Sequence, residues 1–286
     1  MSAEKTPLEP GLHFVATPIG AARDITLRAL DILAAAEVLA AEDTRTLRHL
    51  MEIHGVPLGG RPLVAYHEHN GPRMRPLILA HLAAGRTVAY ASEAGTPLVA
   101  DPGYQLARAA IAAGHRIHAA PGPSALLAAL TVSGLPTDRF LFAGFAPSGR
   151  GQRRRWLAEL ADLPATIVLY ESPRRIQEML EDLESCFGQE RRAALCRELT
   201  KRFEEVTRGT VAELRAALAG RTIRGEIVLV IDRAGDRQVA PADVDDAIRE
   251  ALACHSMKDA VSLVAQQLGL PRRQVYQRAL KLAGDG

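Results

Sequence analysis

The sequence predicts an α/β protein made of two α/β domains, and three observations support this. Short apolar runs alternate with amphipathic helical patterns along most of the chain. The 286 residues exceed the length of one ordinary domain, so two hydrophobic cores are expected. The composition is 48% hydrophobic with 4% aromatic residues, which is typical of α/β proteins rather than all-β proteins.

The predicted N-terminal domain, residues 1–120, repeats the order strand, polar turn, helix. Strands are expected at 12–16, 38–41, 63–66, 87–91 and 116–120, and helices at 25–36, 44–51, 74–84 and 104–113. Turn-forming or charged residues follow the strands. Because ligands of open α/β sheets bind where loops leave the carboxyl ends of strands, these segments predict one crevice.

The predicted C-terminal α/β domain, residues 121–235, has a less regular pattern. Strands are expected at 140–145, 166–170, 193–196, 203–207 and 226–231, and helices at 125–133, from 150 to about 161, up to about 187, and at 211–218. The strands of this half need not be parallel.

The last predicted domain, residues 236–286, is a small helical extension. Helical patterns at 244–254, 257–267 and 272–282 follow a polar linker, and Leu268-Gly269-Leu270-Pro271 forms a turn between the last two. This spacing resembles a helix-turn-helix with a basic final helix. A helical cap packed on the second domain is an equally good interpretation of the same pattern.

The loop from Ser92 to Gly103 is the most unusual segment, because long ordered loops in compact domains are usually functional. Gly95 allows a positive φ or a close backbone approach, and Pro97 and Pro102 restrict the loop. A second Pro/Gly turn, Pro121–Ser124, follows the next strand. We expect both loops to face one ligand; the alternative is a long connection whose small residues fit a crowded surface.

Several classes of function lack their signals. The spacing of the three cysteines does not suit zinc, and His67-Glu68-His69 alone is poor evidence for a metal, so no metal is expected. No apolar run approaches the ~20 residues of a membrane span, and the polar N-terminal segment favours the cytoplasm. The net charge of +2 argues against strong nonspecific nucleic-acid binding by the whole surface. Dinucleotide, Walker and nucleophile-elbow motifs are absent from the sequence.

Eight short motifs, in order along the chain, together resemble the family of ribosomal RNA small subunit methyltransferases I, within the tetrapyrrole methylase superfamily. They are Thr17–Gly20, Ala41–Arg45, Ser92–Pro97, Asp101–Tyr104, Pro121–Ser124, Gly134–Pro136, Tyr170–Ser172 and Arg197–Lys201. The sequence departs from the family pattern at Glu93, where Asp is expected, and at Ala21-Ala22, where Asn-Leu is expected.

This resemblance implies an S-adenosylmethionine-dependent enzyme that methylates the 2′-hydroxyl of a cytidine in the decoding region of small-subunit (16S) ribosomal RNA. It also implies two α/β domains with the cofactor in the cleft between them, a homodimer, and the small-subunit rRNA as partner. The cofactor-lining residues carried over onto the matching motifs are Pro18, Ser92, Glu93, Ala94, Gly95, Ser124, Ala125 and Tyr170.

A ribose hydroxyl is a poor nucleophile, so a carboxylate or a lysine of lowered pKa within hydrogen-bond reach would help as a base. The candidates are Glu171, Lys201, Asp43 and Asp101. Each has a structural alternative: a salt bridge of Glu171 to Arg174 or Arg175, a phosphate contact or solvated charge for Lys201, a helix cap for Asp43, and a turn for Asp101.

Basic residues supply the candidates for RNA contact. They are Arg150, Arg153, Arg154, Arg155, Arg272 and Arg273. The first four suit a phosphate-seeking loop, and the alternative is a solvated helix start. Two other functions stay open: methylation of a tetrapyrrole or another small molecule, and ribosome binding without catalysis.

Overall fold

The computed structural model describes residues 8–235, 241–268, 270 and 272–284. The chain divides into two compact units, Met1–Asp232 and Arg233–Gly286. The first unit contains two five-stranded sheets. The predicted boundaries at residues 120 and 235 remain a proposal, under which this unit contains both α/β domains.

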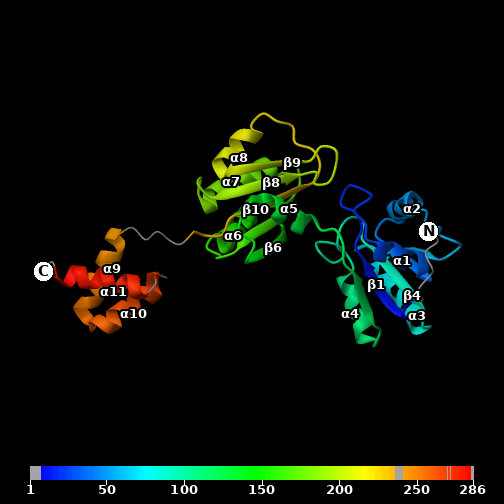
Figure 1. Ribbon diagram of the computed structural model, residues 1–286, viewed down its shortest axis with the longest axis horizontal. Coiled ribbons are helices and arrows are strands. Elements are labelled where there is room, and N and C mark those ends of the chain that lie inside the picture. Colours follow the sequence, from blue (N-terminus) through cyan, green and yellow to red (C-terminus); the bar gives the residue numbers. More distant parts are fainter. Residues whose placement is uncertain (1–7, 236–240, 269, 271, 285–286) are drawn as a thin grey trace. The chain divides into compact units, whose positions relative to one another are not determined.

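The first sheet is fully parallel, with strand order β3-β2-β4-β1-β5. Figure 1 shows its paired strands β1 and β4 next to each other. Its strands are β1 (Gly11–Val15), β2 (Val38–Ala41), β3 (Leu63–Ala65), β4 (Thr87–Ala91) and β5 (Ile117–Ala120). The helices between them are α1 (Leu27–Ala35), α2 (Thr44–Ile53), α3 (Gly71–Ala83) and α4 (Tyr104–Ala112). The prediction for this half is confirmed, although α3 begins three residues before the expected 74.

Every residue of β1, β2 and β4 is buried, because helices cover both faces of the sheet. One core contains Leu33 of α1 and Leu47 of α2, and the opposite core contains Ile78 of α3 and Leu106 of α4. These two cores fix the strands, so the loops at their carboxyl ends start from rigid positions.

The second sheet is mixed, with strand order β6-β7-β10-β8-β9. β6 pairs with β7 in parallel, and the other neighbours are antiparallel, in agreement with the expectation that these strands need not be parallel. The strands are β6 (Phe140–Phe145), β7 (Thr166–Glu171), β8 (Arg192–Arg197), β9 (Glu205–Thr210) and β10 (Ile227–Ile231). The expectation of a strand at 203–207 is corrected to 205–210, because residues 199–203 form turns.

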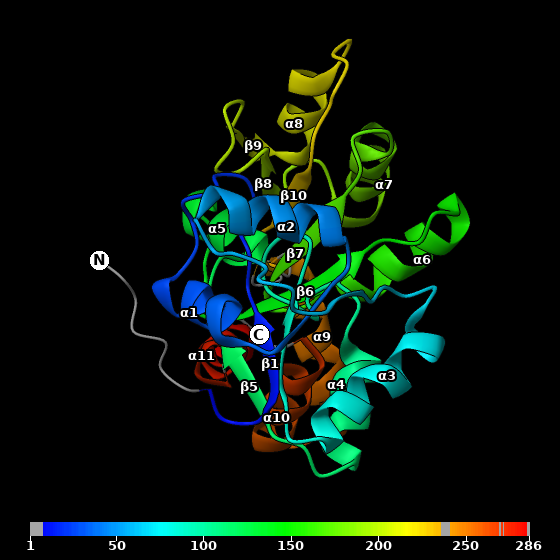
Figure 2. The ribbon, with the colours of Figure 1, turned by 90° about the vertical axis from the view of Figure 1, so that its right-hand side faces the viewer.

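Helices cover both faces of this sheet as well. They are α5 (Ala125–Ser133), α6 (Arg150–Leu160), α7 (Ile176–Phe187) and α8 (Val211–Leu218). Figure 2 shows α5 on one side of β7 and β10 and the pair α6 and α7 on the other. Alternation of side chains along β10 explains this arrangement: Val228 faces the α5 core and Leu229 faces the other core.

The second unit contains α9 (Pro241–Cys254), α10 (Met257–Leu268) and α11 (Arg272–Gly284). These helices share a core of their own, in which Ile248, Val261 and Val275 are buried. Gly269 and Pro271 of the predicted turn lie outside the described residues. Among the helices of the described residues, none is long and apolar enough to cross a membrane.

Candidate active site

A cavity of about 630 Å³ lies where strands of both sheets end. The first sheet contributes the segments after β1 and β4, and the second contributes the end of β7. The start of β10 reaches the same place because β10 is antiparallel to β7, with Ile227 opposite Glu171. The lining residues are Pro18, Ile19, Gly20, Thr46, Glu93, Ala94, Gly95, Thr96, Val99, Ala100, Asp101, Ser124, Ala125, Phe145, Tyr170, Glu171, Ser172, Pro173, Lys201, Gly225, Glu226, Ile227 and Val228.

The loop from Ser92 to Gly103, here called the floor loop, is hydrogen-bonded to the segment after β1. Thr17 and Gly95 exchange backbone hydrogen bonds of 2.9 and 3.0 Å, and the Ser92 hydroxyl donates to the Gly95 carbonyl at 2.6 Å. Gly95 has φ of +82°, which L side chains rarely adopt, and an added Cβ would lie 3.2 Å from Cγ2 of Ile19. The loop therefore needs glycine at this position.

Two contacts join the loops of the first sheet to the rest of the cavity wall. The Thr96 hydroxyl donates to the Pro123 carbonyl at 2.9 Å, and the amide of Ala21 donates to Oγ1 of Thr200 at 3.1 Å. Gly20 packs beside the second contact, where an added Cβ would lie 2.5 Å from Cγ of Lys201 and 2.6 Å from Oγ1 of Thr200. A side chain at position 20 would push these two walls apart.

Left-handed backbone marks both walls. In the described part of the chain, the residues other than glycine with positive φ are Leu98, Ala100, Glu198 and Thr200. Ala100 lines the cavity, and Thr200 precedes the lining residue Lys201. Such conformations cost of order 1–3 kcal/mol each and collect at functional sites, so their position supports a ligand site here.

Asp101 is a lining carboxylate with a raised pKa. Burial, together with the charges of Glu42 and Glu93, raises its pKa to about 7. Its Oδ2 atom is buried and makes no hydrogen bond within the described residues. An acid with a pKa near neutrality in the wall of a cavity suits proton transfer, which supports Asp101 as a base candidate beside the turn role that the sequence also allowed.

Glu171 is almost fully buried at the end of β7, with 2% of its surface exposed. Its Oε1 accepts hydrogen bonds from the Ser172 amide at 2.7 Å and from Nε of Arg175 at 2.8 Å. Its Oε2 is buried without a partner in the described structure. The predicted salt bridge to Arg175 is therefore present, yet it satisfies only one of the two carboxylate oxygens.

The other two base candidates are corrected by their surroundings. Asp43 caps α2 through the Arg45 amide at 2.7 Å, and hydrogen bonds from the Arg45 side chain and backbone lower its pKa to about 2, which makes it a poor base. Lys201 pairs with Glu198 at 2.9 Å and Glu226 at 2.8 Å. Burial lowers the Lys201 pKa, but these bonds outweigh burial and raise it, so Lys201 is not a lysine of lowered pKa.

Seven of the eight residues predicted to line a cofactor are brought together in this cavity: Pro18, Glu93, Ala94, Gly95, Ser124, Ala125 and Tyr170. Ser92 is buried behind the loop, where its hydroxyl holds the Gly95 carbonyl, so its role is to shape the loop. Their function stays a proposal.

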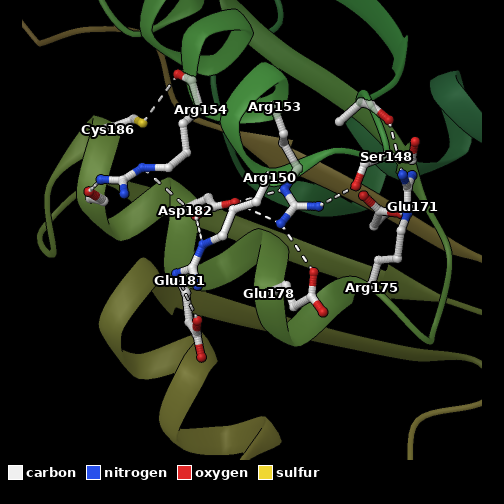
Figure 3. Close-up of polar contacts among 12 residues, drawn as sticks. Ser148, Arg150, Arg153, Arg154, Glu171, Arg175, Glu178, Glu181, Asp182 and Cys186 are labelled. Atoms are coloured by element: carbon white, nitrogen blue, oxygen red, sulfur yellow. Dashed lines mark hydrogen bonds and ion pairs between the residues drawn. The ribbon is translucent and has the colours of Figure 1, made fainter.

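The basic segment at the start of α6 differs most from the prediction. Arg153 is fully buried and pairs with Asp182 at 2.7 Å and Glu178 at 3.2 Å, so it is not available to an RNA phosphate (Figure 3). Arg150 pairs with Glu181 and Asp182, and Arg154 donates to the Ser185 hydroxyl. The segment is the predicted helix start, but its arginines pair with acidic side chains of α7, and neither alternative included this pairing. Arg155 is exposed and stays a candidate.

Arg272 and Arg273 lie at the start of α11 in the second unit, and both side chains are exposed. They line a groove of about 520 Å³ with Lys258 and Tyr276. Their contact with RNA remains a prediction.

Gly225 and Glu226 line the cavity but were not predicted. They precede the strongly apolar β10, and they reach the site through the antiparallel pairing of β10 with β7. A polar Arg-Gly-Glu turn before the last strand is the available sequence signal. Glu42 was likewise missed as a partner that raises the pKa of Asp101. In the described part of the chain, no group of His, Cys, Asp and Glu side chains is arranged to hold a metal ion.

Comparison with known families gives two matches. The family described as Tetrapyrrole (Corrin/Porphyrin) Methylases matches residues 11–215. The family described as RsmI C-terminal HTH domain matches residues 238–283, which favours the helix-turn-helix interpretation of the last helices over a simple cap.

Two relatives that match nearly the whole chain have the same name. The chain is 47% identical over 284 residues to a Mesorhizobium japonicum protein named ribosomal RNA small subunit methyltransferase I, covering 98% of this chain and 96% of the relative. A Xylella fastidiosa protein of the same name is 44% identical over 271 residues, covering 93% and 98%.

Solved structures support the fold. Cobalt precorrin-4 methyltransferase, a cobalamin biosynthetic enzyme, is similar with a TM-score of 0.60 and 18% identity over 77% of this chain and 94% of that one. Uroporphyrin-III C-methyltransferase from Thermus thermophilus, in complex with S-adenosyl homocysteine, is similar with a TM-score of 0.54 and 21% identity over 78% and 97%.

Proposed function

The chain belongs to the ribosomal RNA small subunit methyltransferase I family of the tetrapyrrole methylases, and we propose that it methylates the 2′-hydroxyl of a cytidine in the decoding region of small-subunit ribosomal RNA, using S-adenosylmethionine. The observation that carries this proposal is a cavity shared by two sheets, with the unpartnered oxygens of Asp101 and Glu171 in its wall.

The lining residues fit S-adenosylmethionine. This cofactor is a cation with amine and hydroxyl donors, and the wall contains Glu93, Asp101, Glu171 and Glu226 against one lysine. Two of these carboxylates have an oxygen with no partner inside the described protein, which a ligand donor would satisfy. Because Gly95 has no side chain, the floor loop packs closely against Ile19, and a ligand could contact its backbone directly. When bound, the cofactor supplies a methyl group activated by a positively charged sulfur.

In this proposal the chain positions the reactants, excludes water and removes one proton. Asp101 takes the proton that the ribose hydroxyl gives up, because its pKa of about 7 leaves it about half ionised at neutral pH and largely ionised above it. Glu171, fixed by Arg175, holds a donor group of the cofactor or of the nucleoside. Negative charge in the wall favours a cationic donor, and it disfavours RNA phosphates.

Two other functions remain candidates. The tetrapyrrole fold is compatible with methylation of a small molecule, and a ribosome-binding protein could hold the cofactor without using it. Transfer of tritiated methyl groups to small ribosomal subunits, to naked ribosomal RNA and to a porphyrinogen precursor, assayed side by side, separates the three. We expect counts in the ribosomal substrates; counts in the precursor alone would reject the proposal, and no counts despite cofactor binding would favour the third.

The cavity itself is tested by Gly95→Val. The β-branched side chain would meet Ile19 and strain a backbone at φ of +82°, so we expect calorimetric binding of S-adenosylmethionine to be lost. Gly220→Val is the matched control, because Gly220 has φ of +71° but no neighbour within 4 Å of an added Cβ. Normal affinity in the Gly95 variant would count against this site.

The homodimer and the cytoplasmic location expected from the family and the sequence also stay proposals. The molar mass of the purified chain, measured by light scattering at several concentrations, tests the dimer. Fractionation of cells that express the tagged chain tests the location.

A further inference from the structure

A polyanion such as RNA needs cationic surface, and the two regions considered so far offer little of it. Four carboxylates and one lysine line the cavity. The arginines at the start of α6 are largely paired with the acids of α7. Apart from the exposed Arg155, a cationic surface for RNA is therefore expected in another part of the chain.

The second unit separates its charges between helices. The sequence of α11, RRQVYQRALKLAG, has four basic residues and no acidic residue, whereas that of α9, PADVDDAIREALAC, has four acidic residues and one arginine. Arg278 of α11 pairs with Asp245 at 2.6 Å, and Arg249 pairs with Asp246 at 2.9 Å. Arg278 and Arg249 are therefore paired with acids of α9, whereas the arginines at the start of α11 have no acidic partner within the described residues.

The start of α11 and the start of α10 form a groove of about 520 Å³, lined by Met257, Lys258, Val261, Arg272, Arg273 and Tyr276. Within the described residues neither Lys258 nor Arg273 makes an ion pair, and Arg272 donates to the Ser262 hydroxyl. Tyr276 is 46% exposed, although a large aromatic ring gains by burial. The groove thus combines cations, an exposed aromatic ring and an apolar floor.

We propose that this groove binds a nucleotide of single-stranded RNA, with the phosphate on Lys258 and Arg273 and the base stacked on Tyr276. The choice of RNA rests on the proposed function. Stacking on an aromatic ring requires a base that is not already stacked in a duplex, which favours loops and single strands. An acidic protein segment would use the cations but would leave the ring without a partner.

The experiment measures fluorescence anisotropy of a short labelled single-stranded RNA with the full chain at several salt concentrations. Tyr276→Ala should weaken binding about tenfold, within the usual range for loss of one stacked base, while Tyr276→Phe, which keeps the ring, should bind like the parent. Arg273→Gln should weaken binding and reduce the slope of log affinity against log salt by about one.

Arg249→Gln is the matched control, because it removes the same charge from an exposed position on α9. It should leave RNA affinity unchanged, and far-ultraviolet circular dichroism should give the same melting curve for Tyr276→Ala as for the parent. Equal RNA affinity of the parent, Tyr276→Ala and Arg273→Gln would overturn the proposal. Equal competition by a duplex RNA or by an acidic peptide would also overturn it.

Methyl transfer gives an independent readout. If Tyr276→Ala binds RNA normally while the parent methylates ribosomal RNA, the groove is wrong and the proposed function stands. If RNA binding depends on Tyr276 but no ribosomal substrate is methylated, the proposed function is wrong and the groove stands.

Discussion

Two regions of the first unit contain buried charged groups, and they differ in whether these groups have partners within the protein. Between α6 and α7, Arg153 and Asp182 are both buried, and each has charged partners within 4 Å. In the cavity, Asp101 and Glu171 each keep a buried oxygen without a partner in the described protein. An unpaired buried polar atom costs about 1–3 kcal/mol. The charges between α6 and α7 are satisfied within the protein, whereas the proposed function assigns the unpaired oxygens of the cavity to a ligand.

The difference also shows how far sequence patterns resolve function. A run of arginines first suggested RNA, yet the facing helix supplies enough acids to satisfy it. A lone Asp in a turn suggested structure, yet burial and two neighbouring carboxylates raise its pKa. In both cases the partners, rather than the residue type, decide the role.

The largest effect is expected from Asp101→Asn, which tests whether the unpaired carboxylate of the cavity takes part in catalysis. If Asp101 is the base, the methyl transfer rate should fall about 10²- to 10⁴-fold, as for other general bases. In the parent the rate should rise with pH up to about 7, where Asp101 becomes ionised, and this rise should be absent from the variant. Rates measured from pH 5 to 9 with saturating substrates check it; an unchanged profile would exclude Asp101.

The same substitution has a predicted sign for stability. The folded pKa of Asp101, about 7, lies above its unfolded value near 4, so the folded state binds the proton more tightly. Asp101 therefore removes stability as pH rises from about 4 to 7. Urea unfolding of the parent and Asp101→Asn across this window should show a smaller loss of stability in the variant.

The next effect is on folding. Arg153→Met leaves Asp182 buried beside two weaker partners, and we expect a loss of about 3–5 kcal/mol in the free energy of unfolding. Combining it with Asp182→Leu removes both charges and should recover most of that loss. Urea titrations of the single and double variants test this; a fully additive loss would show that the two charges are not coupled.

A smaller effect is expected from Glu171→Gln, which keeps shape and removes charge. Loss of a charge-assisted hydrogen bond of about 1.5–3 kcal/mol should weaken one ligand about 10- to 100-fold. Calorimetry with S-adenosylmethionine and the KM for ribosomal RNA show which ligand supplies the donor. If neither constant moves, the free oxygen of Glu171 does not meet a ligand.

The smallest effect is expected from Arg150→Gln. The Arg150 side chain is 61% exposed and pairs with Glu181, and Arg153 lies closer to the buried Asp182, which Arg150 also contacts, so we expect Arg150 to contribute about 0–1 kcal/mol. Thermal stability and single-stranded RNA affinity should both stay close to those of the parent. A loss of RNA affinity as large as that of Arg273→Gln would restore the α6 segment as an RNA site.

Local patterns predicted most of the fold. Several elements, such as β4, α5, β6 and α8, have the expected bounds, because apolar period and turn residues determine them. The strand ends that meet at the cavity were also expected from the alternation of strands and helices. Pairing between distant segments was not predictable: nothing near Arg153 indicates that Asp182 faces it, and nothing near Gly225 indicates that β10 starts beside the end of β7.

The close contact of Gly20 with Thr200 and Lys201 restricts which chimeras of this protein and its relatives can fold. A single methyl group at position 20 would collide with Thr200 and Lys201. The residue at position 20, on the side of the first sheet, must therefore fit the residues at 200 and 201, on the side of the second sheet. A chimera that takes residues 1–120 from one family member and the following domain from another should fold when both parents have glycine at position 20. In a parent with a larger residue at this position, we expect the loop around residue 200 to differ as well, so the two domains could be exchanged only together.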